Sequence, residues 1–67
     1  MAKIQLNGKK VVLKQNFSIF QLLKKYKIND KKVAIEVNGK ILPRNKYKDR
    51  ILKDEDKIEI VVFIGGG

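Results

Sequence analysis

Three consecutive glycines, Gly65-Gly66-Gly67, are the residues with the most distinctive chemistry in this sequence. They follow an apolar segment directly, and the backbone freedom of glycine makes them a flexible string without side chains. Fully extended, three residues reach about 10 Å, so this string can thread a channel that any Cβ atom would block. We therefore expect residues 65–67 to form a flexible tail that delivers the carboxylate of Gly67 to the active site of another protein.

The carboxylate of Gly67 needs activation before it can react, because a carboxylate is a poor electrophile. Attack on the α-phosphate of ATP converts it to an acyl adenylate, and a sulfur nucleophile then converts the adenylate to a thiocarboxylate. Gly67 is the candidate reacting residue, with Gly65 and Gly66 as its tether. The competing interpretation is a frayed chain end without a function.

The rest of the chain offers no catalytic constellation. It contains no His and no Cys, which excludes imidazole acid–base chemistry, a thiol nucleophile and any Cys/His metal site. The adjacent acids Asp54, Glu55 and Asp56 lack the ligand spacing of a calcium loop, so a solvated turn is expected there. We predict no metal site.

Length and charge narrow the class of protein further. The 67 residues allow one domain, and no segment is suited to a membrane span or a secretory signal, so a cytoplasmic location without membrane contact is expected. The net charge is +9, with nine Lys and one acid in residues 1–35 (+8) against five Lys, two Arg and six acids in residues 36–67 (+1). A Lys-rich soluble surface explains this better than a nucleic-acid interface, which stays the minority interpretation.

Local patterns predict most of the secondary structure. Asn7-Gly8 lies between two apolar-alternating stretches and predicts a two-residue hairpin turn that places Ile4 opposite Val11. Ser18 and Gln21 fit a capping box, so a helix is expected to begin at Ser18. Its apolar stripe, at the i, i+3, i+4 and i+7 spacing of one helix face, consists of Ile19, Leu22, Leu23 and Tyr26.

The second half of the chain is predicted to supply the remaining strands. Residues 33–37 and 40–42 flank an Asn-Gly turn, residues 44–50 form a polar connector, residues 51–52 form a brief strand and residues 57–64 form the last and longest one. The result is an α+β domain of residues 1–64 with a mixed four- to five-stranded sheet and one main helix packed on one face.

One helix covers only one face of the sheet. If Ile58, Ile60, Val62 and Ile64 point under the helix, the alternation of strand side chains places Val61 and Phe63 on the open face. Together with Val12 they would form an apolar docking patch at the foot of the glycine tail. The alternative is that the connector at residues 44–50 shields them.

These features resemble the β-grasp, ubiquitin-like sulfur carriers, and specifically the ThiS family, which supplies sulfur for the thiazole ring of thiamine. The resemblance covers nearly the whole chain. Its most specific parts are the segments at residues 37–44 (Val-Asn-Gly-Lys-Ile-Leu-Pro-Arg), residues 52–60 (Leu-Lys-Asp-Glu-Asp-Lys-Ile-Glu-Ile) and residues 65–67. Glu55 departs from the pattern because many relatives have glycine there, so this turn must either avoid the left-handed conformation or accept strain.

The resemblance implies a carrier and not an enzyme, with no cofactor of its own. An E1-like adenylating enzyme would activate Gly67 with ATP and magnesium, and a cysteine desulfurase or a sulfur relay would provide the sulfur. Thiazole synthase would receive it from the thiocarboxylate, and Val61, Phe63 and Val12 would contact partners. The alternatives are a sulfur carrier for molybdopterin or another product and, in a different class, a basic β-grasp module that binds RNA.

Overall fold

The computed structural model describes residues 1–63 and has five strands and one α-helix in this range. Two short 3₁₀ helices, Asp30–Lys32 and Arg44–Lys46, lie in the connections. The main elements are β1 (Ala2–Leu6), β2 (Lys9–Leu13), α1 (Ile19–Lys25), β3 (Val33–Val37), β4 (Lys40–Leu42) and β5 (Lys57–Val62).

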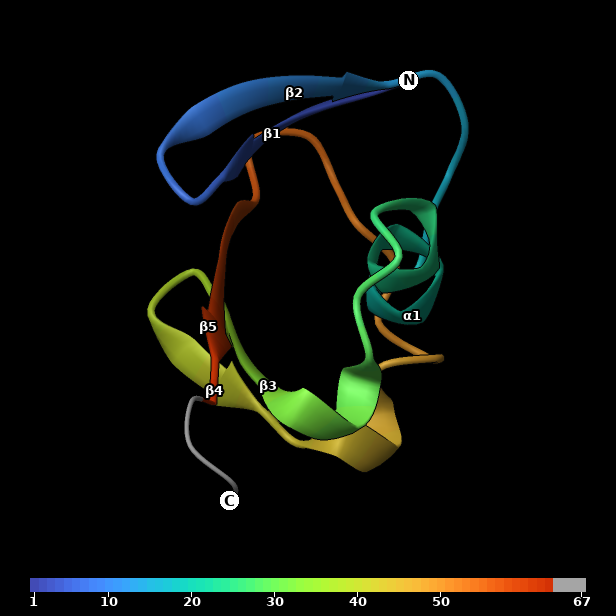
Figure 1. Ribbon diagram of the computed structural model, residues 1–67. Helices are drawn as coiled ribbons and strands as arrows, with labels where there is room; N and C mark the ends of the chain where they lie inside the picture. The colour runs from blue at the N-terminus through green and yellow to red at the C-terminus, as the bar shows by residue number, and fades with distance from the viewer. Residues whose placement is uncertain (64–67) are drawn as a thin grey trace.

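The strands form one mixed sheet in the order β2-β1-β5-β3-β4 (Figure 1). The central pair β1–β5 is parallel, and the other three pairs are antiparallel. The first hairpin has the predicted register, with Ile4 opposite Val11 and Leu6 opposite Lys9. The α+β, β-grasp fold class expected from the sequence is therefore confirmed, with five strands in the sheet.

The helix begins where the capping box predicts. The hydroxyl of Ser18 accepts a hydrogen bond from the Gln21 amide at 3.1 Å, and the Gln21 side chain accepts one from the Ser18 amide at 2.9 Å. These two bonds satisfy backbone donors that the first helical turn leaves free. Buried Ile19, Leu22 and Leu23 then face the sheet.

The end of α1 corrects the predicted apolar stripe, because Tyr26 caps the helix and is 42% exposed. The Lys27 amide donates to the Lys24 carbonyl at 3.0 Å, and the Ile28 amide donates to the Leu23 carbonyl at 2.9 Å. This pair of bonds is the Schellman motif, whose turning residue takes a left-handed conformation, here Lys27 with φ 57°. The chain therefore leaves the helix axis before Tyr26 can pack on the sheet.

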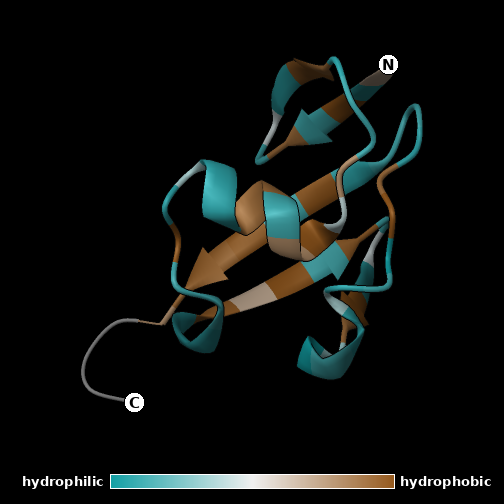
Figure 2. Cartoon of the chain, turned by 90° about the vertical axis from the view of Figure 1, so that its right-hand side faces the viewer, coloured by the Kyte–Doolittle hydropathy of each residue, from teal (hydrophilic) through white to brown (hydrophobic). Residues whose placement is uncertain are grey.

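The core lies between α1 and one face of the sheet. Figure 2 looks from the helix side and shows α1 lying in front of the largely apolar strands. Ile4, Leu13, Ile35 and Ile58 supply the buried sheet side of this core. Because burial of apolar side chains is the main favourable term in folding, this layer is what holds the short helix in place.

The connection between β4 and β5 differs from the sequence expectation. Ile51 makes only an isolated bridge with Ser18, and residues 51–52 form no strand. Buried Leu52 is instead bonded to the Phe17 carbonyl at 2.7 Å, and Tyr47 packs into the core with 3% exposure. The connector thus covers the helix side of the domain, where its carbonyl at Tyr47 accepts from the Phe20 amide.

Candidate functional site

The predicted reacting residue Gly67 and its tether, Gly65 and Gly66, lie outside the described residues, as does Ile64. The boundary expected between the domain and its tail lies there too. The structure describes the chain as far as Phe63, whose amide donates to the Lys32 carbonyl at 2.9 Å. The chain is therefore still held to the segment before β3 at Phe63, one residue beyond the end of β5.

Two asparagines brace β5 from opposite sides, and both occupy left-handed positions in Asn-Gly turns. The Asn7 side chain bonds to the amide and carbonyl of Ile60 at 2.7 and 3.2 Å. The Asn38 side chain accepts from the Lys57 amide at 2.8 Å, and the Asn38 amide donates to the Lys57 carbonyl at the same distance. The two hairpin turns thereby fix the strand that leads to the glycines.

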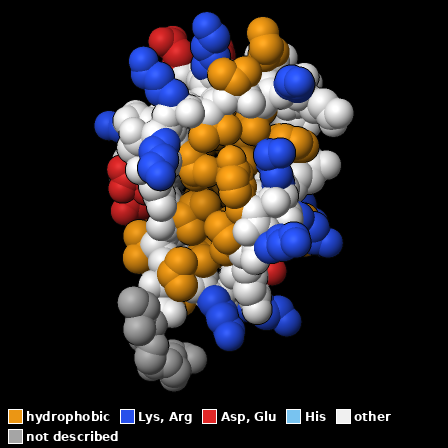
Figure 3. All heavy atoms as spheres, turned by 45° about the horizontal axis from the view of Figure 1, so that its top comes forward, with side chains coloured by type: hydrophobic (Ala, Val, Ile, Leu, Met, Phe, Trp, Pro, Cys, Tyr) orange, Lys and Arg blue, Asp and Glu red, His pale blue; other side chains and the backbone are white. Residues whose placement is uncertain are grey.

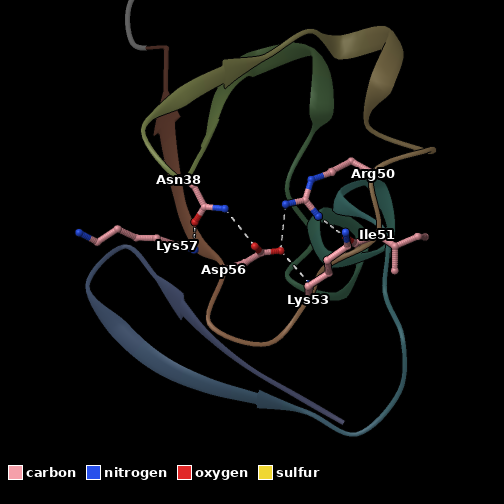
Figure 4. A network of polar contacts seen from close by, with 6 residues as sticks. All are labelled: Asn38, Arg50, Ile51, Lys53, Asp56 and Lys57. Carbon is pink, nitrogen blue, oxygen red and sulfur yellow. Dashed lines mark hydrogen bonds and ion pairs between the residues drawn. The ribbon is translucent and has the colours of Figure 1, made fainter.

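A buried carboxylate fixes the start of β5 (Figure 4). Asp56, which is 6% exposed, accepts from the Asn38 amide group at 3.0 Å and the Lys53 backbone amide at 2.7 Å. Arg50 completes the network with an ion pair at 3.1 Å. Burial alone raises the pKa of the Asp56 carboxyl, but the bonds from Lys53, Asn38 and Arg50 together hold this pKa below its usual value. This carboxylate is structural, because its oxygens are engaged by groups of its own chain.

The open face of the sheet carries an apolar patch near the end of β5. Val61 and Phe63 are 51% and 56% exposed, so the predicted exposure of both residues is confirmed. The connector does not shield them, because it packs on the helix side through Tyr47. Ile41 is 73% exposed and belongs to the same face. It pairs with Glu36, and Val61 pairs with Ala34; because Ala34 and Glu36 are two residues apart in β3, their side chains and those of their partners point to the same side of the sheet. We call Ile41, Val61 and Phe63 the open-face patch.

Sequence reasoning missed Ile41, although a signal for it exists. The two-residue turn at Asn38-Gly39 places Lys40 opposite Val37 and hence Ile41 opposite Glu36. Because Glu36 points away from the helix, Ile41 must do so as well. The register of the second hairpin therefore already implies that the patch has a third member.

The structure does not bring Val12 together with Val61 and Phe63. Val12 shares their face of the sheet, but it pairs with Lys3. The Lys3 carbonyl accepts a hydrogen bond from the Glu55 amide, so Val12 lies level with the turn that precedes β5. Val61 lies six positions beyond Glu55 along the chain, a distance of about 20 Å in an extended strand. The 54% exposed Val12 therefore lies at the opposite end of the open face.

One residue predicted to lie under the helix does not. Val62 points to the helix side, since it pairs with buried Val33, yet it is 56% exposed. The seven residues of α1 rise only about 10 Å, whereas the six residues of β5 extend over about 20 Å. The helix is too short to cover the end of the strand, so Ile58 is buried, Ile60 is partly buried and Val62 is open.

Two further features of the described residues bear on the class of protein. Within residues 1–63, no three His, Cys, Asp or Glu side chains are grouped as metal ligands. No helix in that part of the chain has the length and apolar character needed to cross a membrane.

The domain, its braced last strand and its open-face patch are those of a β-grasp protein, and comparison with known proteins identifies the family. The ThiS family model matches residues 2–67. The sulfur carrier protein ThiS of Bacillus subtilis is 43% identical over 65 residues, which cover 96% of this chain and 98% of that protein. The chain therefore belongs to the ThiS family.

A solved structure and a larger protein extend the comparison. The crystal structure of the thiamine biosynthesis protein ThiS from Geobacter metallireducens superposes with a TM-score of 0.83 at 29% identity, covering 97% of this chain and 99% of that one. A thiazole synthase from Paramagnetospirillum magneticum is 37% identical over 65 residues, which are 97% of this chain but 20% of that protein.

Proposed function

We propose that this protein is a sulfur carrier whose C-terminal Gly67 is converted to a thiocarboxylate that donates sulfur for thiazole formation in thiamine biosynthesis. The observation that supports this most strongly is the ThiS family match, which extends through the three glycines at residues 65–67. The Bacillus subtilis relative, a sulfur carrier protein, matches over almost the whole of both chains. The protein would be a substrate of other enzymes and not a catalyst.

The proposed chemistry has two steps. In the first, the Gly67 carboxylate attacks the α-phosphate of ATP, and pyrophosphate leaves as the acyl adenylate forms. In the second, a persulfide on the sulfur donor attacks the activated carbonyl carbon and AMP leaves, which gives an acyl disulfide. A second thiol then attacks the donor's sulfur, so that a disulfide forms on the donor side and the thiocarboxylate is released at Gly67. ATP and magnesium belong to an E1-like adenylating enzyme, and the sulfur comes from a cysteine desulfurase or a sulfur relay.

Gly65 and Gly66 would act as the tether for these steps. A residue without a Cβ atom passes a narrow channel that other residues would block, and three extended residues reach about 10 Å. The braces that Asn7 and Asn38 make to β5 support this arrangement, because a rigid strand limits the volume that the glycines must search. The proposed location of the carrier and its partners is the cytoplasm, where ATP is available.

Thiazole synthase is the proposed acceptor of the sulfur. The thiazole synthase of Paramagnetospirillum magneticum contains a segment 37% identical to nearly the whole of this chain, and this segment makes up a fifth of its length. A second thiazole synthase, from Magnetococcus marinus, also matches 97% of this chain with 20% of its own length, at 37% identity. A carrier-like segment within the same polypeptide as the synthase supports a direct functional relationship between the two.

The open-face patch is the proposed contact for the adenylating enzyme. Val61 and Phe63 expose apolar surface close to the point where the chain continues toward the glycines, and Ile41, level with Glu59, adds exposed apolar surface farther back on the same face. An exposed apolar cluster of this kind is typical of a protein interface. Val12, which the sequence suggested as a further member, would contact a partner only if that partner reached across the whole open face.

Two other functions make different predictions. A carrier for molybdopterin or another product would use the same glycines and the same activation but a different acceptor. A basic RNA-binding module would bind with a strong salt dependence and would not need Gly65, Gly66 or Gly67. The +9 net charge is the observation that keeps the second possibility open.

The deciding experiment is intact-protein mass spectrometry of the chain with a free C-terminus. The protein is incubated with ATP, magnesium, a ThiS-adenylating enzyme and a sulfur source. A mass gain equal to the exchange of one oxygen for sulfur, located in the peptide that ends at Gly67, is the expected result. The matched control lacks Gly66 and Gly67, keeps the fold and should not be adenylated.

Two results would contradict the proposal. Adenylation of the shortened chain at a normal rate would remove the need for the glycine tether. No mass change in the full chain, with the adenylating enzyme active on another carrier, would favour a binding module. Addition of thiazole synthase then separates the pathways, since only a thiamine carrier should lose its sulfur to that enzyme.

A further inference from the structure

Strand β2 forms an edge of the sheet that is open to another strand. Among residues 1–63 it pairs with β1 alone, and β4 forms the other edge of the five-stranded sheet. Residues Lys9–Leu13 make up five positions of this edge, whereas β4 has three and is followed by Pro43. An unpaired edge presents backbone donors and acceptors that a further extended chain can satisfy. β2 is thus the longer of the two positions at which the sheet could be extended.

Apolar side chains line the space between this edge and the helix. Val11 and Leu13 point to the helix side of β2, as their pairing with Ile4 and Ala2 requires. A shallow pocket lies between β2 and α1, lined in part by Leu13, Phe17 and Lys25. We call this pocket together with Val11 the β2 groove.

The apolar surface continues from the groove along the side of the domain that the helix leaves uncovered. Leu6 and Ile60, both partly buried, pack against the core on the same face as Val11, and exposed Val62 follows them. Figure 3, seen from the side of the β1–β2 hairpin, shows hydrophobic side chains in one strip down the middle of the molecule. A strip of this kind offers several adjacent positions for the side chains of one bound segment.

The charged side chains that line the pocket, Lys14 and Lys25, are both basic, whereas the acidic Glu55 lines a second pocket that includes Val11. Lys9 and Lys14 lie at the two ends of β2, and Lys25 lines the pocket from the helix; all three are exposed. Figure 3 shows basic side chains on both sides of the apolar strip. The one acid of residues 1–35, Asp30, lies on another side, where it contributes to raising the pKa of Tyr47 after the larger effect of burial. The lysines around the pocket therefore favour a partner segment with negative charge.

We propose that the edge of β2 binds an extended acidic segment of a partner protein. The segment adds a strand next to β2, places alternate apolar side chains in the β2 groove and sets Asp or Glu side chains against Lys9, Lys14 and Lys25. This contact is separate from the open-face patch, which lies on the other face of the sheet. It goes beyond the carrier function, since a partner could hold the domain here while Gly67 reacts elsewhere.

Lysines on an edge strand also have a protective role, because they discourage pairing between two copies of the same chain. The two roles are compatible: a row of cations repels another β2 and attracts an acidic segment. They differ in one observable consequence, since only the proposed role predicts binding of an acidic peptide along β2.

The test uses the full chain labelled with ¹⁵N and a synthetic peptide with the core Val-Ile-Val flanked on both sides by Asp and Glu. Amide resonances of Lys9–Leu13 and of the helix end near Lys25 should shift on addition of the peptide. A peptide with Lys in place of the acids, and an acidic peptide with Pro at the central position, should not bind. The affinity should fall as salt is added.

Charge-reversing variants locate the site. Lys14→Glu and Lys25→Glu should each weaken binding roughly fivefold, in line with the loss of one exposed charge pair. The matched control is Lys40→Glu, which makes the same change of charge on the other edge strand and should leave the affinity unchanged. All three positions are exposed, so the variants should keep the fold.

Three outcomes would overturn the proposal: no resonance shift at millimolar peptide, shifts confined to the open-face patch, or an equal loss of affinity in Lys40→Glu. An equal loss in Lys40→Glu would show that the peptide is attracted by the net charge of the protein and not by a site at β2. Because the peptide test requires neither ATP nor a sulfur source, its failure would leave the carrier proposal standing, and failure of the sulfur-transfer experiment would leave this one standing.

Discussion

The Asn7 side chain completes the β1–β5 ladder beyond the end of β1 by bonding to both backbone groups of Ile60. Its Oδ1 accepts from the Ile60 amide at 2.7 Å, and its Nδ2 donates to the Ile60 carbonyl at 3.2 Å. Asn7 lies in the hairpin turn with φ 47°. Because β1 ends at Leu6, the Asn7 side chain makes the two hydrogen bonds to Ile60 that the backbone of a longer β1 would have made. A tight turn at one end of the sheet thus stabilises the strand that leads to the glycines.

Replacement of Asn7 by glycine should destabilise the domain by about 1 kcal/mol, because two hydrogen bonds are lost at an exposed site. Glycine adopts the positive φ without strain, so Asn7→Gly isolates the contribution of the side chain. Urea unfolding measures the change in free energy. Hydrogen exchange should show faster exchange of the Ile60 amide in the variant.

The control for this variant is Asn16→Gly, at an exposed position in the loop before the helix. It makes the same change of residue type outside the sheet and should leave exchange at Ile60 unchanged. If Asn7→Gly and Asn16→Gly had equal effects on stability and on Ile60, the bonds from Asn7 would contribute nothing specific to β5.

The parts of the fold that sequence reasoning predicted are those set by neighbouring residues. Asn7-Gly8 determines the turn and therefore the register of the first hairpin, because each two-residue turn permits one pairing. Ser18 and Gln21 determine the start of the helix in the same local way. The resemblance to the ThiS family then supplied the fold class, a mixed sheet with one helix on one face. The order of the strands, β2-β1-β5-β3-β4, depends on pairings between distant segments that no local pattern contains.

The parts that it did not predict depend on contacts between distant segments. Tyr26 continues the helical period, and its exposure follows from the left-handed turn at Lys27. Such turns are usually made by Gly or Asn, so a lysine at this position does not predict one. Tyr47 lies in a polar segment whose composition predicts exposure to solvent, but its side chain packs into the core. Asp56 belongs to a run of acids that suggests a solvated turn, and its burial depends on Asn38 and Arg50.

The network around Asp56 predicts a pH-dependent stability. Its pKa is lower in the folded chain than in the unfolded chain, so the stabilisation is complete above the unfolded value of about 4 and is lost as the pH falls through the folded value. Asp56→Asn should cost about 2 kcal/mol at pH 7, since it removes a buried charge that is paired with Arg50. Near pH 3 the difference between the two proteins should shrink.

Urea unfolding of both proteins at pH 7 and pH 3 measures this effect. Asp49→Asn serves as the control, because it removes an exposed carboxylate outside the network and should change the stability little at either pH. A destabilisation by Asp56→Asn that is equal at the two pH values would show that shape and hydrogen bonding, and not charge, account for the role of Asp56.

The open-face patch predicts a separation between binding and stability. Phe63→Asp and Ile41→Asp should each weaken binding to the adenylating enzyme at least tenfold, as loss of a central apolar contact does in protein interfaces. Neither should lower the unfolding free energy by more than about 0.5 kcal/mol, because both side chains are exposed. Titration calorimetry and urea unfolding give the two quantities.

Val12→Asp is the matched control for the patch, since it places the same charge on the same face at the other end of the sheet. Binding should be close to that of the unchanged protein. Loss of binding in Val12→Asp alone would move the docking surface to the β1–β2 hairpin, and a Phe63→Asp protein that unfolds would place Phe63 in the core.

Glu55 is the residue whose replacement should stabilise the protein. It lies in the turn before β5 with φ 70°, a left-handed conformation that costs a residue with a Cβ atom about 1 kcal/mol or more. The turn accepts this strain, in keeping with the resemblance to relatives that have glycine at the position. Glu55→Gly relieves the strain but adds freedom to the unfolded chain, so a net gain of about 0.5 kcal/mol is expected in urea unfolding. Glu55→Ala removes the same charge and keeps the strain, and it should give no gain. If alanine stabilised the protein as much as glycine, the cost at this position would come from the carboxylate and not from the backbone.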